Sequence, residues 1–581
     1  MKRFLFLLSI VIFFTSFINA QSLESRLELE KNMVLLKNKQ NIIPLLYLDT
    51  IRLFIVGDSL RFTSFYTATL RYTNIVKKKP NLTIYLIDTN HIYYKFNHPN
   101  IIIVFDTSLN LIDQIAGNAD ALLYVPRTDS LAQDYAVQLI FGAIGAQGLL
   151  KKNTKFFKKN TGIKTISGIR LKYTIPSELG LDSFFIFSQI DSIVNNAIAL
   201  HAFPGCQILA AKDGKVFFYK SYGFLTYDSL IPVSMNHLYD LASITKIAAS
   251  TPCLLLLYDK NLIALDKPLS KYIPWLKFSN KRNITLIDAL THQAGLKPWI
   301  PFWRYTLDKK DILKKRYFSV DSSKRFSYVV AQDLYTNKKT QKLIRKLIKE
   351  SKLLPKKQYK YSDLSFYLYP ELIQRLTKDD FVNCLRKNFY NPLGAWRMTF
   401  NPYEFYQRQL IVPTEWDSLF RKQLIWGYVH DEGAAMKGGI SGHAGLFSNA
   451  DDLAKLMQMY LNYGKYGTET FISDTSLKSW TSYQFSQLGN RRGIAFDKPL
   501  LSNPEKGTPS PLASPLSFGH SGFTGTFAWA DPQNGLLFIF LSNRVYPTRK
   551  NRNLIRYNIR TNIHTTLYQA IIKTLKNEEN Y

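Results

Sequence analysis

The sequence contains little cysteine and no low-complexity tract. Its 581 residues include three cysteines, Cys206, Cys253 and Cys384, an odd number spread widely along the chain. We therefore expect no disulfide framework, no metal site and no cofactor. With 46% hydrophobic and 20% charged residues, the chain has enough apolar side chain for proper hydrophobic cores. Its length predicts two or more domains.

Acidic residues are also scarce. The chain has 43 Asp and Glu against 75 Lys and Arg, which gives a net charge of +32. Such a surplus is typical of proteins that bind nucleic acid or another polyanion. However, the basic residues are spread along the chain, and the sequence is rich in Phe, Tyr, Ile and Asn, whose codons are AT-rich. We favour compositional drift as the cause and expect no nucleic-acid partner.

The densest basic block lies at residues 304–357, with 17 Lys or Arg and 5 acidic residues. One interpretation is a patch that meets an anionic polymer. The other, which we favour, is a solvated helical insertion.

The sequence lacks an apolar run long enough to span a membrane comfortably, but its first residues form another pattern. Lys2 and Arg3 precede an apolar run at residues 4–14, and the small residue Ala20 follows. This pattern predicts a secretory signal peptide over residues 1–20 and a periplasmic or otherwise exported protein. No cysteine follows the apolar run, so a lipoprotein anchor is not expected. An uncleaved signal is the one membrane contact that we consider.

Short apolar runs, each ending in a turn residue, divide residues 23–175. The candidate strands are residues 52–58, 82–88, 101–106 and 119–125. Near-continuous apolar runs suit strands buried on both faces, as in a parallel sheet covered by helices. Helix-length polar segments, such as residues 130–142, alternate with these candidate strands. We predict a small α/β sandwich.

Several pieces of this region match a known domain. Residues 33–39 and 43–45, and residues 118–121 followed by 139–142, resemble the C-terminal sandwich domain of glycoside hydrolase family 3. In that family the sandwich follows a barrel that carries the nucleophilic Asp, and there is no room for a barrel before Leu23. The resemblance therefore implies a non-catalytic sandwich that binds, packs or spaces.

The remaining region, residues 181–577, has the pattern of a mixed α+β domain. Asp213-Gly214 separates apolar runs at 207–211 and 216–219, and a turn at 531–535 separates 526–530 from 536–541. Both arrangements predict β-hairpins. A closing helix is expected over 553–575. Terminal strands around a long helical middle predict an antiparallel sheet built from both ends of the domain, with a helical lobe inserted.

The segment at residues 240–248 contains Ser243 and Lys246. If a helix starts just before Ser243, positions i and i+3 share a face, which places the lysine amine beside the hydroxyl. A serine hydroxyl becomes a good nucleophile when a neighbouring base accepts its proton. A lysine whose pKa is lowered by burial can be that base or tune it.

Two further motifs follow in order. Tyr361-Ser362-Asp363 lies after Lys360, and His520-Ser521-Gly522 opens the last strand pair. The order Ser-x-x-Lys, Tyr-Ser-Asp and His-Ser-Gly matches the penicillin-recognising serine hydrolases, and the domain resembles their class C β-lactamase branch, which includes esterases and D-alanyl carboxypeptidases. Supporting matches occur at residues 288–296, 391–394 and 439–448.

This resemblance assigns roles to particular residues. Ser243 would be the nucleophile that forms an acyl-enzyme, and Lys246 and Tyr361 would move its proton. The backbone N–H groups of Ser243 and Phe523 would form the oxyanion hole. The substrate-binding residues implied by the motifs are Asp363, His520, Ser521 and Gly522.

Two departures from the usual motifs limit the substrate. His520 stands where most β-lactamases have a lysine that receives the substrate carboxylate, and an ordinary histidine titrates near pH 6.5. Asp363 stands where Asn is common and puts a negative charge near the acyl amide. Both changes argue against an efficient antibiotic-destroying enzyme and are familiar among esterase and peptidase-like members.

The remaining polar candidates look structural. The segment His430-Asp431-Glu432 is expected to form a salt-bridge cluster in a loop rather than to border the cleft. His443 and His292 are expected to be packed, hydrogen-bonded histidines.

Together these features predict an exported serine hydrolase that acts on an amide, peptide or ester bond of a cell-wall (peptidoglycan) fragment, as a D-alanyl carboxypeptidase or an esterase does. Two alternatives remain open. One is a non-catalytic cell-wall-binding protein with degenerate domains. The other is residual N-acetylglucosaminidase activity, which the missing barrel disfavours.

Overall fold

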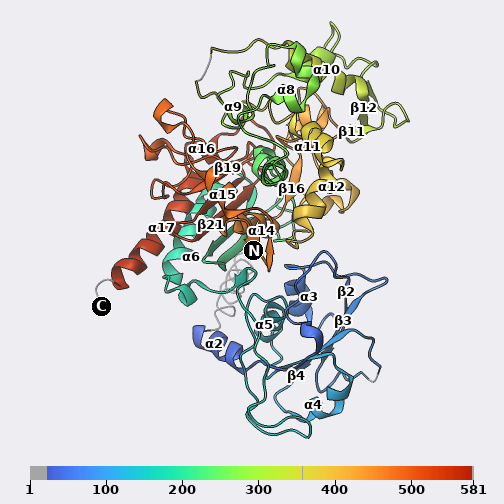
Figure 1. Cartoon of the computed structure of the whole chain (residues 1–581), viewed down its shortest axis with the longest axis vertical. Coiled ribbons are helices and arrows are strands. Elements are labelled where there is room, and N and C mark those ends of the chain that lie inside the picture. Colours follow the sequence, from blue (N-terminus) through green and yellow to red (C-terminus); the bar gives the residue numbers. More distant parts are fainter. Residues whose placement is uncertain (1–21, 94, 356–357, 579–581) are drawn as a thin grey trace, which may run out of the picture. The chain divides into compact units, whose positions relative to one another are not determined.

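The computed structural model describes residues 22–93, 95–355 and 358–578 (Figure 1). The predicted signal peptide, residues 1–20, lies outside this described part of the chain. The chain divides into two compact units, Met1–Gly180 and Leu181–Tyr581. In the described residues, no helix combines the length and the hydrophobicity needed to cross a bilayer.

The first unit contains a five-stranded sheet in the order β1-β5-β4-β3-β2. Its strands are β1 (Val34–Asn38), β2 (Leu53–Val56), β3 (Leu82–Ile87), β4 (Asn100–Phe105) and β5 (Ala121–Val125), and a short strand β6 (Lys172–Tyr173) comes later. Strands β2 to β5 are parallel, as predicted, and β1 is an antiparallel edge strand. The helices are α2 (Leu23–Asn32), α3 (Thr63–Thr69), α4 (Asn110–Ile115) and α5 (Ser130–Ile140).

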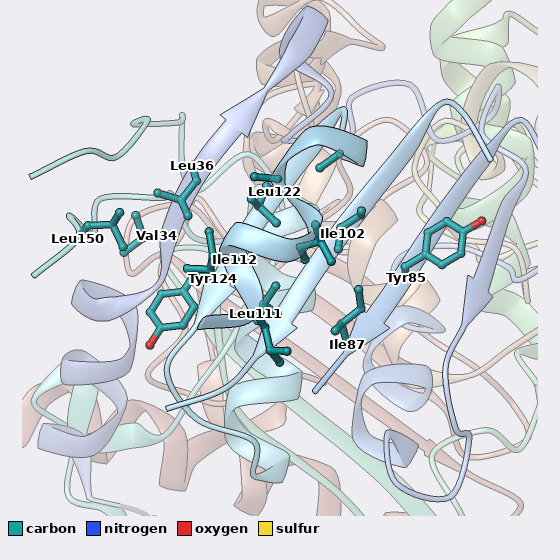
Figure 2. Packing of buried hydrophobic residues seen from close by; sticks show 14 residues of the cluster. Val34, Leu36, Tyr85, Ile87, Ile102, Leu111, Ile112, Leu122, Tyr124 and Leu150 are labelled. Atoms are coloured by element: carbon teal, nitrogen blue, oxygen red, sulfur yellow. The ribbon is translucent and has the colours of Figure 1, made fainter. Parts of the chain in front are cut away.

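Both faces of this sheet are buried, which explains its near-continuous apolar strands. On one face, Ile87 and Ile102 belong to a buried cluster with Leu111 and Ile112 of α4 (Figure 2). The alternate residues point the other way, and there the ring of Phe105 lies 5.4 Å from that of Phe62, just before α3.

The sheet of the second unit joins the two ends of its sequence. The strands β7 (Gly205–Lys212), β8 (Lys215–Gly223), β19 (Phe518–Ser521), β20 (Phe527–Asp531) and β21 (Leu536–Ser542) run in the order β19-β20-β21-β7-β8. All these neighbours are antiparallel, and β21 pairs with β7 over its whole length. The two predicted hairpins are therefore confirmed, with Asp213 and Gly214 both at positive φ in the first turn.

All seven residues of β21 are buried, which indicates that both faces of this sheet are covered. Helix α14 (Ala450–Leu461) packs against β20, β21 and β7, and α6 (Ser183–Ala199) packs against α17 (Ile559–Glu578) (Figure 1). The predicted closing helix is wrong in one respect. It is divided into α16 (Asn553–Arg556) and α17 because Asn558 takes a left-handed conformation, φ 49°.

The rest of this unit is the predicted inserted lobe. Its helices are α7 (Thr251–Asp259), α8 (Leu269–Tyr272), α9 (Leu286–Leu290), α10 (Lys338–Glu350), α11 (Tyr369–Thr377), α12 (Phe381–Leu385), α13 (Glu432–Ala435) and α15 (Asp474–Thr481). Its short strands are β9 (Tyr239–Asp240), β10 (Phe318–Ser319), β11 (Tyr328–Ala331), β12 (Leu334–Thr336), β13 (Thr399–Phe400), β14 (Trp416–Asp417), β15 (Gln423–Leu424), β16 (Leu446–Ser448), β17 (Lys465–Tyr466) and β18 (Glu469–Thr470).

The basic block at 304–357 is only partly helical. Strands β10, β12 and β11 form a small sheet within it, and α10 follows. Helix α10 buries Thr340, Ile344 and Ile348, which recur at helical spacing. Its lysines therefore lie mainly on the opposite, solvated side.

The fold brings two of the distant cysteines together. The Sγ atoms of Cys253 on α7 and Cys384 on α12 are 3.1 Å apart, and both side chains are buried thiols. Cys206 is buried separately in β7. Sequence spacing did not indicate this contact, because packing between two helices creates it.

Candidate active site

The segment that carries Ser243 is a tight turn rather than the start of a regular helix. A 3-10 turn, η4 (Ala242–Ile244), leads into a π-turn, η5 (Lys246–Ser250), and then into α7. Side chains at i and i+3 eclipse in a 3-10 turn, and Lys246 Nζ donates to Ser243 Oγ at 2.9 Å. Ala242 has a φ of 45°, a strained value for a non-glycine residue. Asp240 stabilises this turn by accepting a 2.8 Å hydrogen bond from the Ala242 N–H.

The amine of Lys246 is completely buried, yet it has a charged partner. Asp363 Oδ1 lies 2.6 Å from Nζ, and the carbonyl oxygen of His443 accepts a longer bond at 3.4 Å. Burial alone would lower the pKa of Lys246, but Asp363 and Tyr361 more than offset it and raise the pKa above its ordinary value. Burial therefore does not leave this lysine with a lowered pKa, because the carboxylate of Asp363 stands where a neutral Asn is common.

Tyr361 completes the group around Ser243. Lys246 Nζ lies 5.0 Å from the centre of its ring. Burial and the charge of Asp363 raise the pKa of Tyr361, although Lys246 opposes this, so the phenol is neutral at pH 7. The ring of His292 lies 4.5 Å from that of Tyr361, and His292 Nδ1 accepts a hydrogen bond from Ser362 N at 3.2 Å. His292 thus positions the Tyr361 segment, in agreement with its predicted structural role.

The loop after β19 lies against the backbone just before Ser243. Thr524 Oγ1 donates to the carbonyl of Asp240 at 2.7 Å, and Thr526 Oγ1 donates to that of Leu241 at 3.0 Å. Gly522 is required here, because a Cβ at this position would lie 2.5 Å from the Leu241 oxygen. Among the described residues, the backbone N–H of Phe523 has no hydrogen-bond acceptor. This geometry leaves an amide donor unused beside the nucleophile turn.

His520 lies on β19, and its Nδ1 bonds the Ser521 carbonyl at 2.8 Å. Burial, with the nearby cations Arg492 and Lys246, lowers the pKa of His520 to about 3. The side chain is therefore neutral at physiological pH, and it does not supply the positive charge that a lysine supplies at this position. The pKa of His520 thus lies well below that of an ordinary histidine, and the sequence does not reveal the burial or the two cations that cause this. Within the described part of the chain, Nε2 has no hydrogen-bond partner.

Residues 439–448, one of the segments that supported the family resemblance, lie against the nucleophile turn. Ser250 Oγ, after Lys246, donates to the Gly442 carbonyl at 2.8 Å, and Leu446 N donates to Thr245 Oγ1 at 3.2 Å. Strand β16 also pairs with β9, which ends at Asp240. Residues 439–448 therefore support the position of Ser243 without contributing a side chain to it.

The polar cluster at 430–432 forms ion pairs, as predicted. His430 Nε2 lies 3.0 Å from Glu415, and Arg549 bonds both Glu415 and Glu432, at 2.6 and 2.8 Å. His443 is buried, and its Nε2 lies 2.9 Å from Asp431 Oδ1. This interaction keeps the pKa of Asp431 below its ordinary range in spite of its burial.

A pocket of about 600 Å³ opens at Ser243. Its other lining groups include Tyr361, His520, Ser521, Gly522 and Phe523, together with six arginines, Arg491, Arg492, Arg544, Arg549, Arg552 and Arg560. The structure thus brings the predicted site residues together, since Lys246 lies behind the lining and contacts Ser243, Tyr361 and Asp363. The sequence interpretation missed the arginines, although four of them lie between residues 544 and 560.

Across the described residues, no group of three or more His, Cys, Asp or Glu side chains is arranged to hold a metal ion. The polar groups gathered beside Ser243 are the amine of Lys246, the carboxylate of Asp363 and the phenol of Tyr361.

Comparison with known proteins places this site in a wider group. The family described as Beta-lactamase matches residues 190–562. A protein of Escherichia coli K12 named "Putative D-alanyl-D-alanine carboxypeptidase" is 30% identical over 397 residues, which cover 63% of this chain and 85% of that protein. The protein of that name from Salmonella enteritidis PT4 is 29% identical over 412 residues, 65% of this chain and 88% of the other.

Solved structures show weaker similarity. A penicillin-binding protein homologue from Caulobacter crescentus is 18% identical with a TM-score of 0.47, covering 66% of this chain and 97% of that one. EstCE1, described as a hydrolase with promiscuous acyltransferase activity, is 15% identical with a TM-score of 0.48, covering 65% of this chain and 98% of its own.

Proposed function

The chain belongs to the beta-lactamase family of serine hydrolases, and we propose that it cleaves an amide, peptide or ester bond of cell-wall fragments through an acyl-enzyme at Ser243. The observation that carries this proposal is the buried contact between Lys246 Nζ and Ser243 Oγ, 2.9 Å long, with Asp363 2.6 Å from the same amine. A nucleophile, a base and a group that orients the base lie within hydrogen-bond reach of one another.

The raised pKa of Lys246 requires a first proton transfer before this lysine can act as a base. We propose that Lys246 first loses its proton to solvent, which leaves a neutral amine facing Ser243 with Asp363 holding the amine in position. The amine then takes the hydroxyl proton while Oγ attacks the substrate carbonyl and forms a C–O bond. As the tetrahedral intermediate collapses, the leaving group departs with a proton from Lys246, relayed through Tyr361.

The oxyanion of this intermediate needs hydrogen-bond donors that are already in position. The N–H groups of Ser243 and Phe523 are the proposed donors, because the loop that carries Phe523 is bonded to the backbone at Asp240 and Leu241. Loss of one such donor costs about 10²- to 10³-fold in other hydrolases. Water then attacks the acyl-enzyme by the reverse route and restores Ser243.

The substrate is proposed from two kinds of support. The related proteins of Escherichia coli and Salmonella carry the name of D-alanyl-D-alanine carboxypeptidases, and Asp363 and His520 depart from the motifs of β-lactamases. We place the chain in the class C branch and propose peptidase or esterase activity on wall peptides. The signal-like pattern of residues 1–20 supports the proposal that the protein is exported. We also propose that the first unit is a family 3 sandwich without glycosidase chemistry.

The direct test is the intact mass of the protein after exposure to a penicillin and, separately, to a fluorophosphonate. We expect a covalent adduct from both reagents in the wild type and none in Ser243→Ala. The matched control is Ser418→Ala, which removes an exposed serine and should label like the wild type.

Other outcomes change the proposal in definite ways. An adduct from the fluorophosphonate alone would favour an esterase over a wall peptidase. If neither reagent labels a folded wild-type protein, the acyl-enzyme mechanism is wrong and a non-catalytic wall-binding protein is favoured.

A further inference from the structure

The pocket at Ser243 has an unusual balance of charge. Six arginines line it, and Asp497 is its one acidic lining residue within the described chain. Each arginine stays charged at neutral pH, so their partners decide whether the charge is already compensated in the free protein.

Three of the arginines have carboxylate partners. Arg549 bonds Glu415 and Glu432, as described above. Arg491 makes a bidentate pair with Asp497, with distances of 2.7 and 3.0 Å. Arg492 shares that carboxylate at 3.3 Å, so Asp497 compensates only one of these two charges.

The other three, Arg544, Arg552 and Arg560, form no ion pair with any described residue. Arg544 donates to the carbonyl of Asn551 at 2.7 Å, and its guanidinium lies 4.7 Å from the ring centre of Phe523. Arg560 donates to the carbonyl of Thr526 at 2.9 Å. These carbonyls fix the direction of two guanidinium groups but do not neutralise them.

The proximity of these positive charges is unfavourable for the folded protein. Burial and the charge of Arg552 lower the pKa of Arg544 to about 10, and burial and Arg544 lower that of Arg560 to about 10. Both groups remain charged at pH 7, at a cost to the folded state. Buried like charges without counter-ions are rare unless a ligand supplies the opposite charge.

The positions of these residues relate the charge to the reaction. Arg544 follows β21, Arg552 immediately precedes α16, and Arg560 lies in the first turn of α17. Arg544 contacts Phe523 and Arg560 bonds Thr526, two residues of the loop that places the proposed oxyanion donor. A ligand bound by these arginines therefore lies in the same pocket as Ser243.

We infer that this pocket recognises a substrate bearing at least two carboxylate groups, held by Arg544, Arg552 and Arg560. Guanidinium groups pair with carboxylates through two parallel hydrogen bonds, and three of them without carboxylate partners exceed what one carboxylate requires. A volume of about 600 Å³ leaves room for a short polycarboxylate peptide. The inference rests on the proposed function in one respect, which is that the bound anion is taken to be the substrate of Ser243.

The test uses protection of Ser243 in the full chain. An uncharged alkyl fluorophosphonate labels the serine, and acetate, succinate or propane-1,2,3-tricarboxylate is added at matched ionic strength. We expect half-maximal protection at concentrations that fall about tenfold or more with each added carboxylate, because each added carboxylate gains charge-assisted hydrogen bonds to a guanidinium group. Equal protection by all three anions at matched ionic strength would overturn the inference.

Variants test whether these particular arginines, rather than the overall positive charge of the protein, bind the anions. Arg552→Gln changes an exposed side chain, and Arg560→Gln provides a second position, so a folding failure at one still leaves a test. Each should weaken protection by the tricarboxylate about tenfold or more relative to acetate. Arg556→Gln, which removes a nearby exposed arginine outside the pocket lining, should leave that ratio unchanged.

The two proposals fail in different ways. If neither the fluorophosphonate nor a penicillin labels Ser243, the proposed function is wrong, and a calorimetric titration with the tricarboxylate still measures the affinity of the pocket for that anion. If labelling proceeds and the tricarboxylate protects Ser243 equally well in Arg552→Gln, Arg560→Gln and the wild type, the polycarboxylate inference is wrong. The acyl-enzyme proposal would be unaffected.

Discussion

The two walls of the active-site pocket differ in how far their positive charges are compensated by carboxylates. On the nucleophile side, the ammonium of Lys246 is fully buried but has the Asp363 carboxylate 2.6 Å away. On the arginine side, Arg544, Arg552 and Arg560 lie in one pocket and have no carboxylate partner among the described residues. The first wall is electrostatically complete before substrate arrives, as a preorganised catalytic group must be. The second wall has positive charges that no carboxylate of the described chain compensates, which suits selection of an anionic ligand.

The largest effect is expected from removing the cation of the complete wall. Lys246→Met should lower turnover of an aryl ester by about 10²- to 10⁴-fold, because Ser243 loses its proton acceptor. The variant should also be less stable, since Asp363 keeps a partly buried charge without a partner. Steady-state kinetics and urea unfolding measure the two effects.

A double variant sharpens this prediction. Lys246→Met with Asp363→Asn removes both charges, so it should recover stability relative to Lys246→Met without recovering turnover. Recovery of turnover would show that Lys246 is not the base.

The next effect concerns the pH dependence. The Asp363 charge raises the pKa of Lys246 against the effect of burial, so Asp363→Asn should let burial lower it. A lower pKa means that the neutral amine forms at lower pH, so the rising limb of kcat/KM should move to lower pH by about one unit or more. Asp321→Asn, at an exposed position, is the control. A limb that stays in place or moves to higher pH would contradict the role of Asp363.

His520 should affect stability rather than catalytic titration. Its pKa is about 3 in the folded protein, below that of an ordinary histidine, so between about pH 6.5 and 3 the unfolded chain binds a proton that the folded one does not. Stability from this group is complete above pH 6.5 and falls by up to about 1.4 kcal/mol per pH unit below it. Urea unfolding of His520→Gln from pH 7 to 4 should therefore show a shallower decline than the wild type. An identical decline would contradict the lowered pKa.

The smallest effect is expected on the arginine wall. Arg552→Glu places a carboxylate near Arg544 and should stabilise the free protein by about 0.2–1 kcal/mol, since the position is exposed. The same change should weaken protection by polycarboxylates. Arg556→Glu is the matched control for stability measured by urea unfolding. A loss of stability in Arg552→Glu would show that the wall is compensated in a way that the ion pairs do not reveal.

Local patterns predicted much of this molecule. Ser243 and Lys246 are three residues apart, so any tight turn brings them together, and the Asp213-Gly214 hairpin depends on two residues that accept positive φ. The parallel strands of the first unit were recognisable because both of their faces are buried. These features depend on neighbours in the sequence, which is why they could be predicted.

Features that depend on distant contacts could not be predicted in this way. The raised pKa of Lys246 arises from Asp363, which is 117 positions later, and the arginine wall combines residues 491–492 with residues 544–560. The neutral state of His520 likewise depends on burial and on Arg492. In each case the charge of a side chain was visible in the sequence, but its surroundings were not.

The pairing of β21 with β7 also has a consequence for biosynthesis. Thr524 bonds the backbone of Asp240, 284 residues earlier, so the turn that holds Ser243 is completed only when almost the whole unit has been made. At roughly 5–20 residues per second, a ribosome needs on the order of 15–60 s to cover that interval. During this time β7 has an unpaired, apolar edge in the nascent chain, a state prone to aggregation. Ribosome-bound or translocating chains of this protein should therefore depend on chaperones until β21 emerges.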